Sequence, residues 1–231
     1  TDLIHVNVHK KRLWFVEKDS TKAWYLATEA VAGAATSFQL GSNFNRGGYL
    51  VAMATWTLDY GAGPDDYAAF VSSEGQVAIY QGTDPASILT WELIGVFNLA
   101  PPIGRRCFAQ FGASPLLITA QGILQLSLAV KTDEAQLLST ALTNRISNSI
   151  NTAARNYDGN FGWEICIYPR GTRMILNIPT AENSTAKQYV MNTITNAWCE
   201  FDGHDANCWL VFNDELYFGS NIGTVAKADQ T

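Results

Sequence analysis

The chain has 231 residues, of which 47% are hydrophobic and only 16% charged, a balance that suits a globular protein with a sizeable core. Aromatic residues make up 12% and include seven tryptophans, which favours sheets packed on sheets over a helical protein. The net charge of -6 argues against a general nucleic-acid-binding protein, whose affinity depends on Lys and Arg neutralising phosphates.

Short strands are predicted at the start of the chain. Apolar and polar residues alternate over residues 3–8, which indicates a strand with one buried and one polar face. The face expected to be buried consists of Ile4, Val6 and Val8, and the polar face consists of His5, Asn7 and His9. Two histidines on one face could bind a metal, but no third ligand follows at a suitable spacing, so both are assigned to the polar surface. Residues 13–16 and 23–26 form the next predicted hairpin, and residues 27–48 are predicted as loop with an edge strand at 38–40.

The most informative stretch is a hairpin predicted over residues 70–80, which follows a strand at 49–56 and an acidic turn at 59–66. Gly75 supplies the positive φ that a tight turn needs. The same order of an apolar residue, a hydroxyl residue and a glycine returns at 117–122 and 218–223. Gly75 and Gly122 are 47 positions apart and Gly122 and Gly223 are 101 apart, which matches one and two propeller blades of about 40–50 residues. Glycine turns also occur in any all-β protein.

Two tryptophans mark outer strands of this pattern. Trp91 opens a strand predicted at 91–97, and Trp198 lies at the start of a strand predicted at 197–202, after a polar turn. They are 107 positions apart, roughly two blades. In kelch-like propellers a Trp in this position packs between neighbouring blades, although the paired glycines of a kelch repeat are missing from this sequence.

Arg105 and Arg106 form the most basic point of the chain. Two adjacent side chains point to opposite faces of an extended segment, so at most one of them is expected to serve a single pocket. A phosphate or a carboxylate of a partner could bind there, but ordinary pairing with acidic loops of the chain itself is favoured.

Residues 133–157 are predicted to form one amphipathic helix, the only helix expected, because apolar residues recur at every fourth position. These positions are Leu138, Leu142, Ile146, Ile150 and Ala154. The helix is expected to pack on its own domain, with packing against another subunit as the alternative. The candidate interface residues are therefore Arg105, Arg106, Leu138, Leu142, Ile146 and Ile150.

Strands return after residue 161. They are predicted at 163–168, 174–178, 188–192, 197–202, 208–212, 216–219 and 224–227. Four strands to a blade give about five blades, with the helix in place of the outer strand of the third blade and no outer strand in the last. The predicted fold is all-β, one β-propeller-like domain over residues 1–231 with an inserted helix. The ring is incomplete unless residues elsewhere supply the missing strand, and the chain is expected to be part of a longer protein.

No catalytic or cofactor-binding motif is recognised: the G-x-S-x-G elbow, the Walker loop, the G-x-G-x-x-G loop and the H-E-x-x-H helix are all missing. His204 lies between aspartates without a nucleophile and is interpreted as a turn residue. Four cysteines without a paired spacing are predicted to be reduced core thiols; they are Cys107, Cys166, Cys199 and Cys208. We expect no enzyme activity, no metal, no cofactor and, with no apolar run of about 18 residues, no membrane span.

Several stretches resemble a known family. They are residues 11–17 (KRLWFVE), 75–85 (GQVAIYQGTDP), 103–107 (IGRRC) and 189–193 (YVMNT). Together they resemble structural tail proteins of short-tailed bacteriophages and prophages, the hub or nozzle component below the portal. The resemblance covers nearly the whole chain and brings no catalytic residue with it. It implies a hexameric ring in the virion tail, made in the bacterial host cytoplasm and in contact with other tail proteins and with portal or adaptor proteins.

The predicted function is therefore that of a tail component, part of a ring through which DNA passes. An acidic wall would repel phosphates and let DNA slide without specific binding. A receptor- or glycan-binding propeller is one alternative, in which exposed Trp and Tyr stack on sugars. The other is a cell-wall polysaccharide hydrolase, with its acid and base drawn from Asp65, Asp66, Asp202 and Asp205.

Overall fold

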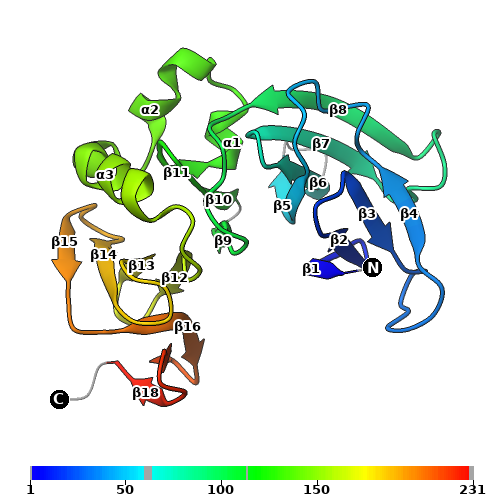
Figure 1. Cartoon of the computed structure of the whole chain (residues 1–231). Coiled ribbons are helices and arrows are strands. Elements are labelled where there is room, and N and C mark those ends of the chain that lie inside the picture. Colours follow the sequence, from blue (N-terminus) through cyan, green and yellow to red (C-terminus); the bar gives the residue numbers. More distant parts are fainter. Residues whose placement is uncertain (1, 60–63, 113, 229–231) are drawn as a thin grey trace.

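The structure is a computed structural model that describes residues 2–59, 64–112 and 114–228. Its strands form five antiparallel sheets that follow one another along the chain, numbered here as sheets 1 to 5 (Figure 1). Within each sheet, strands that are neighbours in space are also neighbours in sequence. The prediction of an all-β protein is confirmed.

The sheets contain four or three strands each. Sheet 1 consists of β1 (Leu3–His9), β2 (Arg12–Glu17), β3 (Lys22–Tyr25) and β4 (Thr36–Gln39). Sheet 2 consists of β5 (Leu50–Asp59), β6 (Pro64–Ser72), β7 (Gln76–Gly82) and β8 (Trp91–Asn98). Sheet 3 consists of β9 (Phe108–Phe111), β10 (Ser114–Thr119) and β11 (Gly122–Gln125). Sheet 4 consists of β12 (Glu164–Tyr168), β13 (Arg173–Pro179), β14 (Ala186–Asn192) and β15 (Trp198–Phe201). Sheet 5 consists of β16 (Ala206–Phe212), β17 (Glu215–Ser220) and β18 (Val225–Lys227).

The recurring glycine hairpin occupies the same place in three sheets. Gly75 and Gly223 lie in the turns between the second and third strands of sheets 2 and 5, with φ of 79° and 80°, and Gly122 begins the third strand of sheet 3 directly after the corresponding turn, with φ of 127°. The predicted turns are therefore confirmed, together with the positive φ that glycine was expected to supply. Sheets 1 and 4 make the corresponding turn without glycine, over residues 18–21 and 180–185.

The sheets are arranged along an arch, with their first strands toward its inside and their last strands toward its outside (Figure 1). The main contacts between sheets join consecutive sheets, chiefly through these first strands. Three sets of contacts give their direction: His5–Met53 and Asn7–Thr55 between sheets 1 and 2, Gly104–Trp163 and Arg106–Glu164 between sheets 3 and 4, and Gly162–Asn207 and Glu164–Trp209 between sheets 4 and 5. In each set the two residue numbers rise together, so the paired segments run in the same direction. The turns between second and third strands consequently lie on the same side in sheets 1 and 2, and on the same side in sheets 3, 4 and 5.

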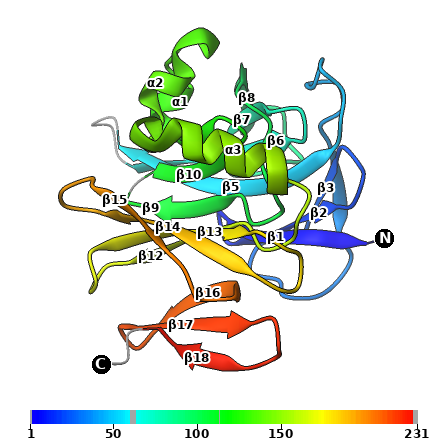
Figure 2. The same cartoon turned by 60° about the vertical axis from the view of Figure 1, so that its left-hand side comes forward.

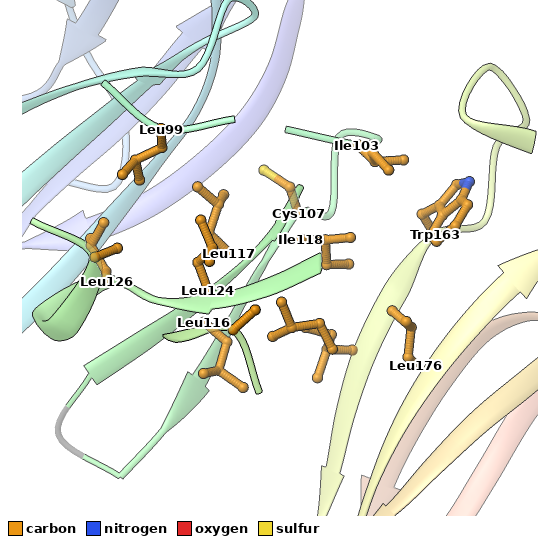
Figure 3. Close-up of a cluster of buried hydrophobic side chains, with 14 of the residues drawn as sticks. Leu99, Ile103, Cys107, Leu116, Leu117, Ile118, Leu124, Leu126, Trp163 and Leu176 are labelled. Atoms are coloured by element: carbon orange, nitrogen blue, oxygen red, sulfur yellow. The ribbon is translucent and has the colours of Figure 1, made fainter. Parts of the chain in front are cut away.

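Three hydrophobic clusters fill the spaces between the sheets. The first lies between sheets 1 and 2 and is aromatic, with Trp91 stacked on Tyr80 and on Trp14 at centroid distances of 5.5 and 5.7 Å. The expectation that Trp91 packs between neighbouring units is confirmed. The central cluster surrounds sheet 3 and includes faces of sheets 2 and 4, with Leu99 and Leu176 among its members (Figure 3). The third lies between sheets 4 and 5 and includes Trp209.

The helical insertion differs from the prediction. Residues 133–157 do not form one helix but α2 (Leu137–Thr140), α3 (Ser147–Tyr157) and two 3-10 turns, after a further short helix, α1 (Leu126–Ala129). The break has a physical cause at residues 141–143, where Ala141 is extended and the chain turns beside β11, the edge strand of sheet 3. Leu142 N–H donates to Ile123 O over 2.9 Å, and the buried Thr143 hydroxyl accepts from Ile123 N–H over 3.1 Å. Figure 2 shows the helices together on one side of the sheets.

The first strand is turned over relative to the prediction from Val6 to His9, whereas Ile4, beside a register shift between Leu3 and His5, packs against the first cluster. Val6 and Val8 are each 58% exposed, whereas His9 is only 1% exposed. The histidine side faces β5, where His5 Nε2 lies 2.8 Å from Met53 O. Polar partners on β5 therefore make the histidine side the buried one. Burial lowers the pKa of both histidines, that of His9 to about 4.

All four cysteines are free, as predicted. Cys107 and Cys166 are buried, and burial raises the pKa of each thiol to about 12. Cys199 and Cys208 are exposed, so their predicted place in the core is wrong. No helix within the described ranges is long and apolar enough to cross a membrane.

Candidate functional site

A cleft of about 670 Å³ lies at the inside of the arch and is shared by four of the five sheets. One part of its wall comes from turns between second and third strands: Lys18 and Asp19 of sheet 1, Ser73 of sheet 2, Ala120 of sheet 3 and Glu182 of sheet 4. The other part comes from first strands and the segments that lead into them: Ile4, Tyr49, Val51, residues 101–105 and residues 158–161. We name this the axial cleft.

Arg105 reaches the axial cleft because the chain bulges out of sheet 3. Before the bulge, Pro102 forms a bridge with Thr119; after it, Cys107 O accepts a hydrogen bond from Ile118 N–H over 2.8 Å. Between these points the chain leaves the sheet, with Gly104 at φ +71° beside Trp163. The exposed Arg105 lines the cleft, whereas Arg106 on the same bulge does not.

Arg106 is held within the chain instead. Its Nη1 donates to Glu164 Oε2 over 3.1 Å, its Nη2 donates to Asn207 O over 2.7 Å, and its guanidinium lies 4.8 Å from the Phe161 ring centroid. Burial raises the pKa of Glu164, while Arg106 and a hydrogen bond from Trp209 N–H oppose that shift. Arg106 therefore joins sheets 3, 4 and 5, and the two arginines serve different surroundings.

The chemical character of the axial cleft is mixed. Basic Arg105 and Lys18 face acidic Asp19, Asp158 and Glu182 across the same space. Tyr49 and Phe161 add aromatic surface, with exposures of 42% and 49%. No histidine or cysteine lines the cleft, and the described residues contain no group of three His, Cys, Asp or Glu side chains that could hold a metal. Such a wall suits polar contacts and stacking.

A second cavity of about 540 Å³ adjoins the axial cleft, because Ala120 and Asp158 line both. Leu138 lines it and is 39% exposed. The other helical candidates are placed differently: Leu142 and Ile146 are half-buried against the central cluster, and Ile150 is 2% exposed within it. The structure brings Arg105 and Leu138 to adjoining cavities and uses Ile150 in the core of its own domain.

The carboxylates considered for polysaccharide hydrolysis have partners in the fold. Asp66 pairs with Lys10 at 3.2 Å, Asp202 Oδ1 accepts from Gly203 N–H, and Asp205 Oδ1 accepts from Ala186 N–H. The side chain of Asp65 and residues 60–63 of the predicted acidic turn lie outside the described part of the chain.

Sequence reasoning missed the acidic residues that do line the cleft, which are Asp19, Asp158 and Glu182. The signal that could have found two of them is their position in the turn between second and third strands, where the repeated hairpin has its glycine. Asp158 follows α3 and carried no comparable signal.

No protein-family model matches the chain, and a comparison with curated proteins finds no match either.

Proposed function

We propose that the protein is a structural component of a bacteriophage tail, a hub, nozzle or head-to-tail adaptor that forms part of a ring through which DNA passes. In this proposal its five sheets are blades of an incomplete β-propeller. The observation that supports it most is the arrangement of five consecutive sheets with their first strands inside one arch. Stacked units that bury a continuous core make a rigid scaffold.

The charge of the chain supports the same proposal. A ring around DNA must not hold it, and a net charge of -6 repels phosphates. The axial cleft adds carboxylates rather than a cluster of arginines and lysines. Proposed partners are other copies in a hexameric ring, other tail proteins and the portal or adaptor, and the proposed location is the virion.

Electron microscopy of the longer protein tests this function. We expect rings with a lumen wide enough for duplex DNA, and no retention of DNA at physiological salt. A longer protein that stays a monomer at high concentration, or one that binds duplex DNA tightly, would contradict the proposal.

A glycan-binding role is a second candidate, favoured by the exposed Tyr49 and Phe161 beside acidic groups in the axial cleft. Aromatic rings stack on the faces of sugars, and carboxylates accept hydrogen bonds from sugar hydroxyl groups. Binding on a glycan array that disappears in Tyr49→Ala would support this role. An array without any binding would remove it.

A further inference from the structure

Two Asp-Gly sequences occur in the chain, Asp158–Gly159 and Asp202–Gly203, and no Asn-Gly sequence does. A glycine after an aspartate has no Cβ to obstruct the backbone nitrogen between the two residues, and it allows the widest range of backbone angles. That nitrogen can therefore reach the carboxyl carbon of the preceding aspartate. Each linkage is a place where the main chain can rearrange, and the two differ in how the fold holds them.

The Asp202–Gly203 linkage lies in the connection between β15 and β16, and both residues are exposed. Asp202 Oδ1 accepts a hydrogen bond from Gly203 N–H over 2.9 Å. Among the described residues, no other group binds this carboxylate. Gly203 has a φ of +89°, and the space where a Cβ would lie is open. The carboxyl group and the nitrogen that can attack it are thus side by side, and nothing else holds the side chain.

The Asp158–Gly159 linkage is held in a helical conformation instead. Asp158 follows α3 directly with φ −58° and ψ −33°, and its N–H donates to Ala154 O over 3.0 Å. No hydrogen bond joins its side chain to Gly159 N–H in the part of the chain that the structure describes. Attack on the Asp158 carboxyl group requires the main chain to leave this conformation first, and such misalignment slows an intramolecular reaction strongly.

We propose that Asp202 and Gly203 rearrange spontaneously to an isoaspartyl linkage in the folded protein. In the first step Gly203 N attacks Cγ of the protonated Asp202 carboxyl group. The N–Cγ bond forms, the Cγ–OH bond breaks, and the hydroxyl group leaves with the amide proton as water. Water then adds to the Asp202 main-chain carbonyl of the five-membered imide and breaks its bond to Gly203 N. The mass of the chain is unchanged, and no cofactor or oxidant takes part.

The rearrangement lengthens the main chain by one carbon atom at the junction of sheets 4 and 5. The residues that follow are anchored to β14 and to the turn before it. His204 O accepts from Gln188 Nε2 over 2.8 Å, and Asp205 Oδ1 accepts from Ala186 N–H over 3.2 Å. The additional atom displaces these anchors, so the rearranged chain should unfold at a lower urea concentration. The inference does not depend on the proposed function, and failure of either leaves the other in place.

Mass spectrometry of aged protein tests the proposal. The chain is kept for weeks at pH 6 and 37 °C, once folded and once in guanidinium chloride, and is then cut with trypsin. Cleavage after Arg155 and after Lys187 places the two linkages in different peptides. Electron-transfer fragmentation locates isoaspartate, which leaves the peptide mass unchanged. In the folded sample we expect isoaspartate to form at least about tenfold faster at Asp202 than at Asp158, whereas in guanidinium chloride both should form it at similar rates.

Three substitutions sharpen the test. Asp202→Glu should form none at this position, because its longer side chain would have to close a six-membered ring. Asp158→Glu is the matched control and should leave the rate at Asp202 unchanged. Asp202→Asn should form the same imide with loss of ammonia instead of water, which appears as a mass increase once the imide is hydrolysed.

A folded chain that forms no isoaspartate at Asp202 while the denatured chain does would overturn the proposal. Equal rates at Asp158 and Asp202 in the folded chain would overturn it as well. Asp202→Glu aged alongside controls for other damage. If the aged chain and this variant unfold at the same urea concentration, the predicted loosening of the junction is wrong.

Discussion

Arg106 and Glu164 form an ion pair across the junction of sheets 3 and 4, with Nη1 donating to Oε2 over 3.1 Å. The same carboxylate oxygen accepts a hydrogen bond from Trp209 N–H over 2.9 Å, so one side chain serves two junctions. Glu164 thus holds together three sheets that otherwise meet only through hydrophobic contacts and a few polar groups.

Replacing this carboxylate should weaken both junctions. Glu164→Ala leaves Arg106 and Trp209 N–H without their acceptor, and we expect the free energy of unfolding to fall by about 2 kcal/mol. Urea unfolding measures the change. Glu29→Ala is the control, because the Lys11–Glu29 pair is exposed at both ends and is expected to contribute less than about 0.5 kcal/mol. Equal losses in the two variants would contradict the structural role of Glu164.

Asn177 is the hub of a buried polar network between sheets 4 and 5. Its Nδ2 donates to Gly162 O and Ala206 O, and its Oδ1 accepts from Gln188 Nε2 and Trp209 Nε1.

Asn177→Leu keeps the approximate shape of the side chain but removes the polar atoms that make these four hydrogen bonds, and it leaves their partners buried. We therefore expect the free energy of unfolding to fall by about 3 kcal/mol or more. Asn144→Leu, at an exposed position, should change it by less than about 0.5 kcal/mol. Urea unfolding of the pair measures the difference, and a tolerated Asn177→Leu would show that water or a shifted side chain replaces the network.

The repeated hairpin offers a matched pair of glycines. Gly75 and Gly223 have almost the same φ, 79° and 80°, but a Cβ on Gly75 would clash with Leu99 O, whereas a Cβ on Gly223 meets nothing within 4 Å. Gly223→Ala should therefore cost only the strain of the left-handed conformation, about 1 kcal/mol. Gly75→Ala adds a backbone clash and should cost clearly more, visible as a lower melting temperature. Similar melting temperatures for the two variants would mean that the turn at Gly75 can relax.

Stability should depend on pH through His9. Its pKa is about 4 in the folded chain and about 6.5 when unfolded, so the unfolded chain binds more protons between these values. The free energy of unfolding therefore falls as the pH drops from 6.5 toward 4, by up to about 3 kcal/mol from this one group. Asp66 partly offsets the burial that lowers the pKa, and Lys10 reinforces it.

Urea unfolding at pH 7.5 and pH 5 measures this dependence. His9→Asn should show a smaller difference between the two pH values than the unmodified chain. An unchanged difference would assign the pH dependence to other groups.

Local signals in the sequence predicted much of the fold. The turns at Gly75, Gly122 and Gly223 were predictable because a positive φ selects glycine whatever surrounds it. The outer strand at Trp91 was predictable because a strand opened by a large aromatic residue needs a second sheet to cover it.

Other features depend on distant parts of the chain and could not be read locally. Alternation in β1 defined two faces, but Met53 on a different sheet decides that the histidine side is buried. The fourfold apolar spacing in residues 133–157 suited a helix, yet the Leu142 N–H donates to Ile123 O on β11 at the point where the helical pattern breaks.

The candidate site was predictable only at Arg105. Its bulge could be suspected from Gly104 and two adjacent arginines, but the cleft itself is made by turns of four sheets that only the assembled arch brings together. Leu138 was found through helical spacing and reaches the adjoining cavity, although the helix that carries it is shorter than predicted.

The meander order of the sheets also bears on biosynthesis. Each sheet pairs only segments that leave the ribosome one after another, so no strand has to wait for a distant partner before its backbone hydrogen bonds close. The sheets can thus fold one after another from the amino terminus. The apolar face that each new sheet exposes is then covered when the next sheet folds against it.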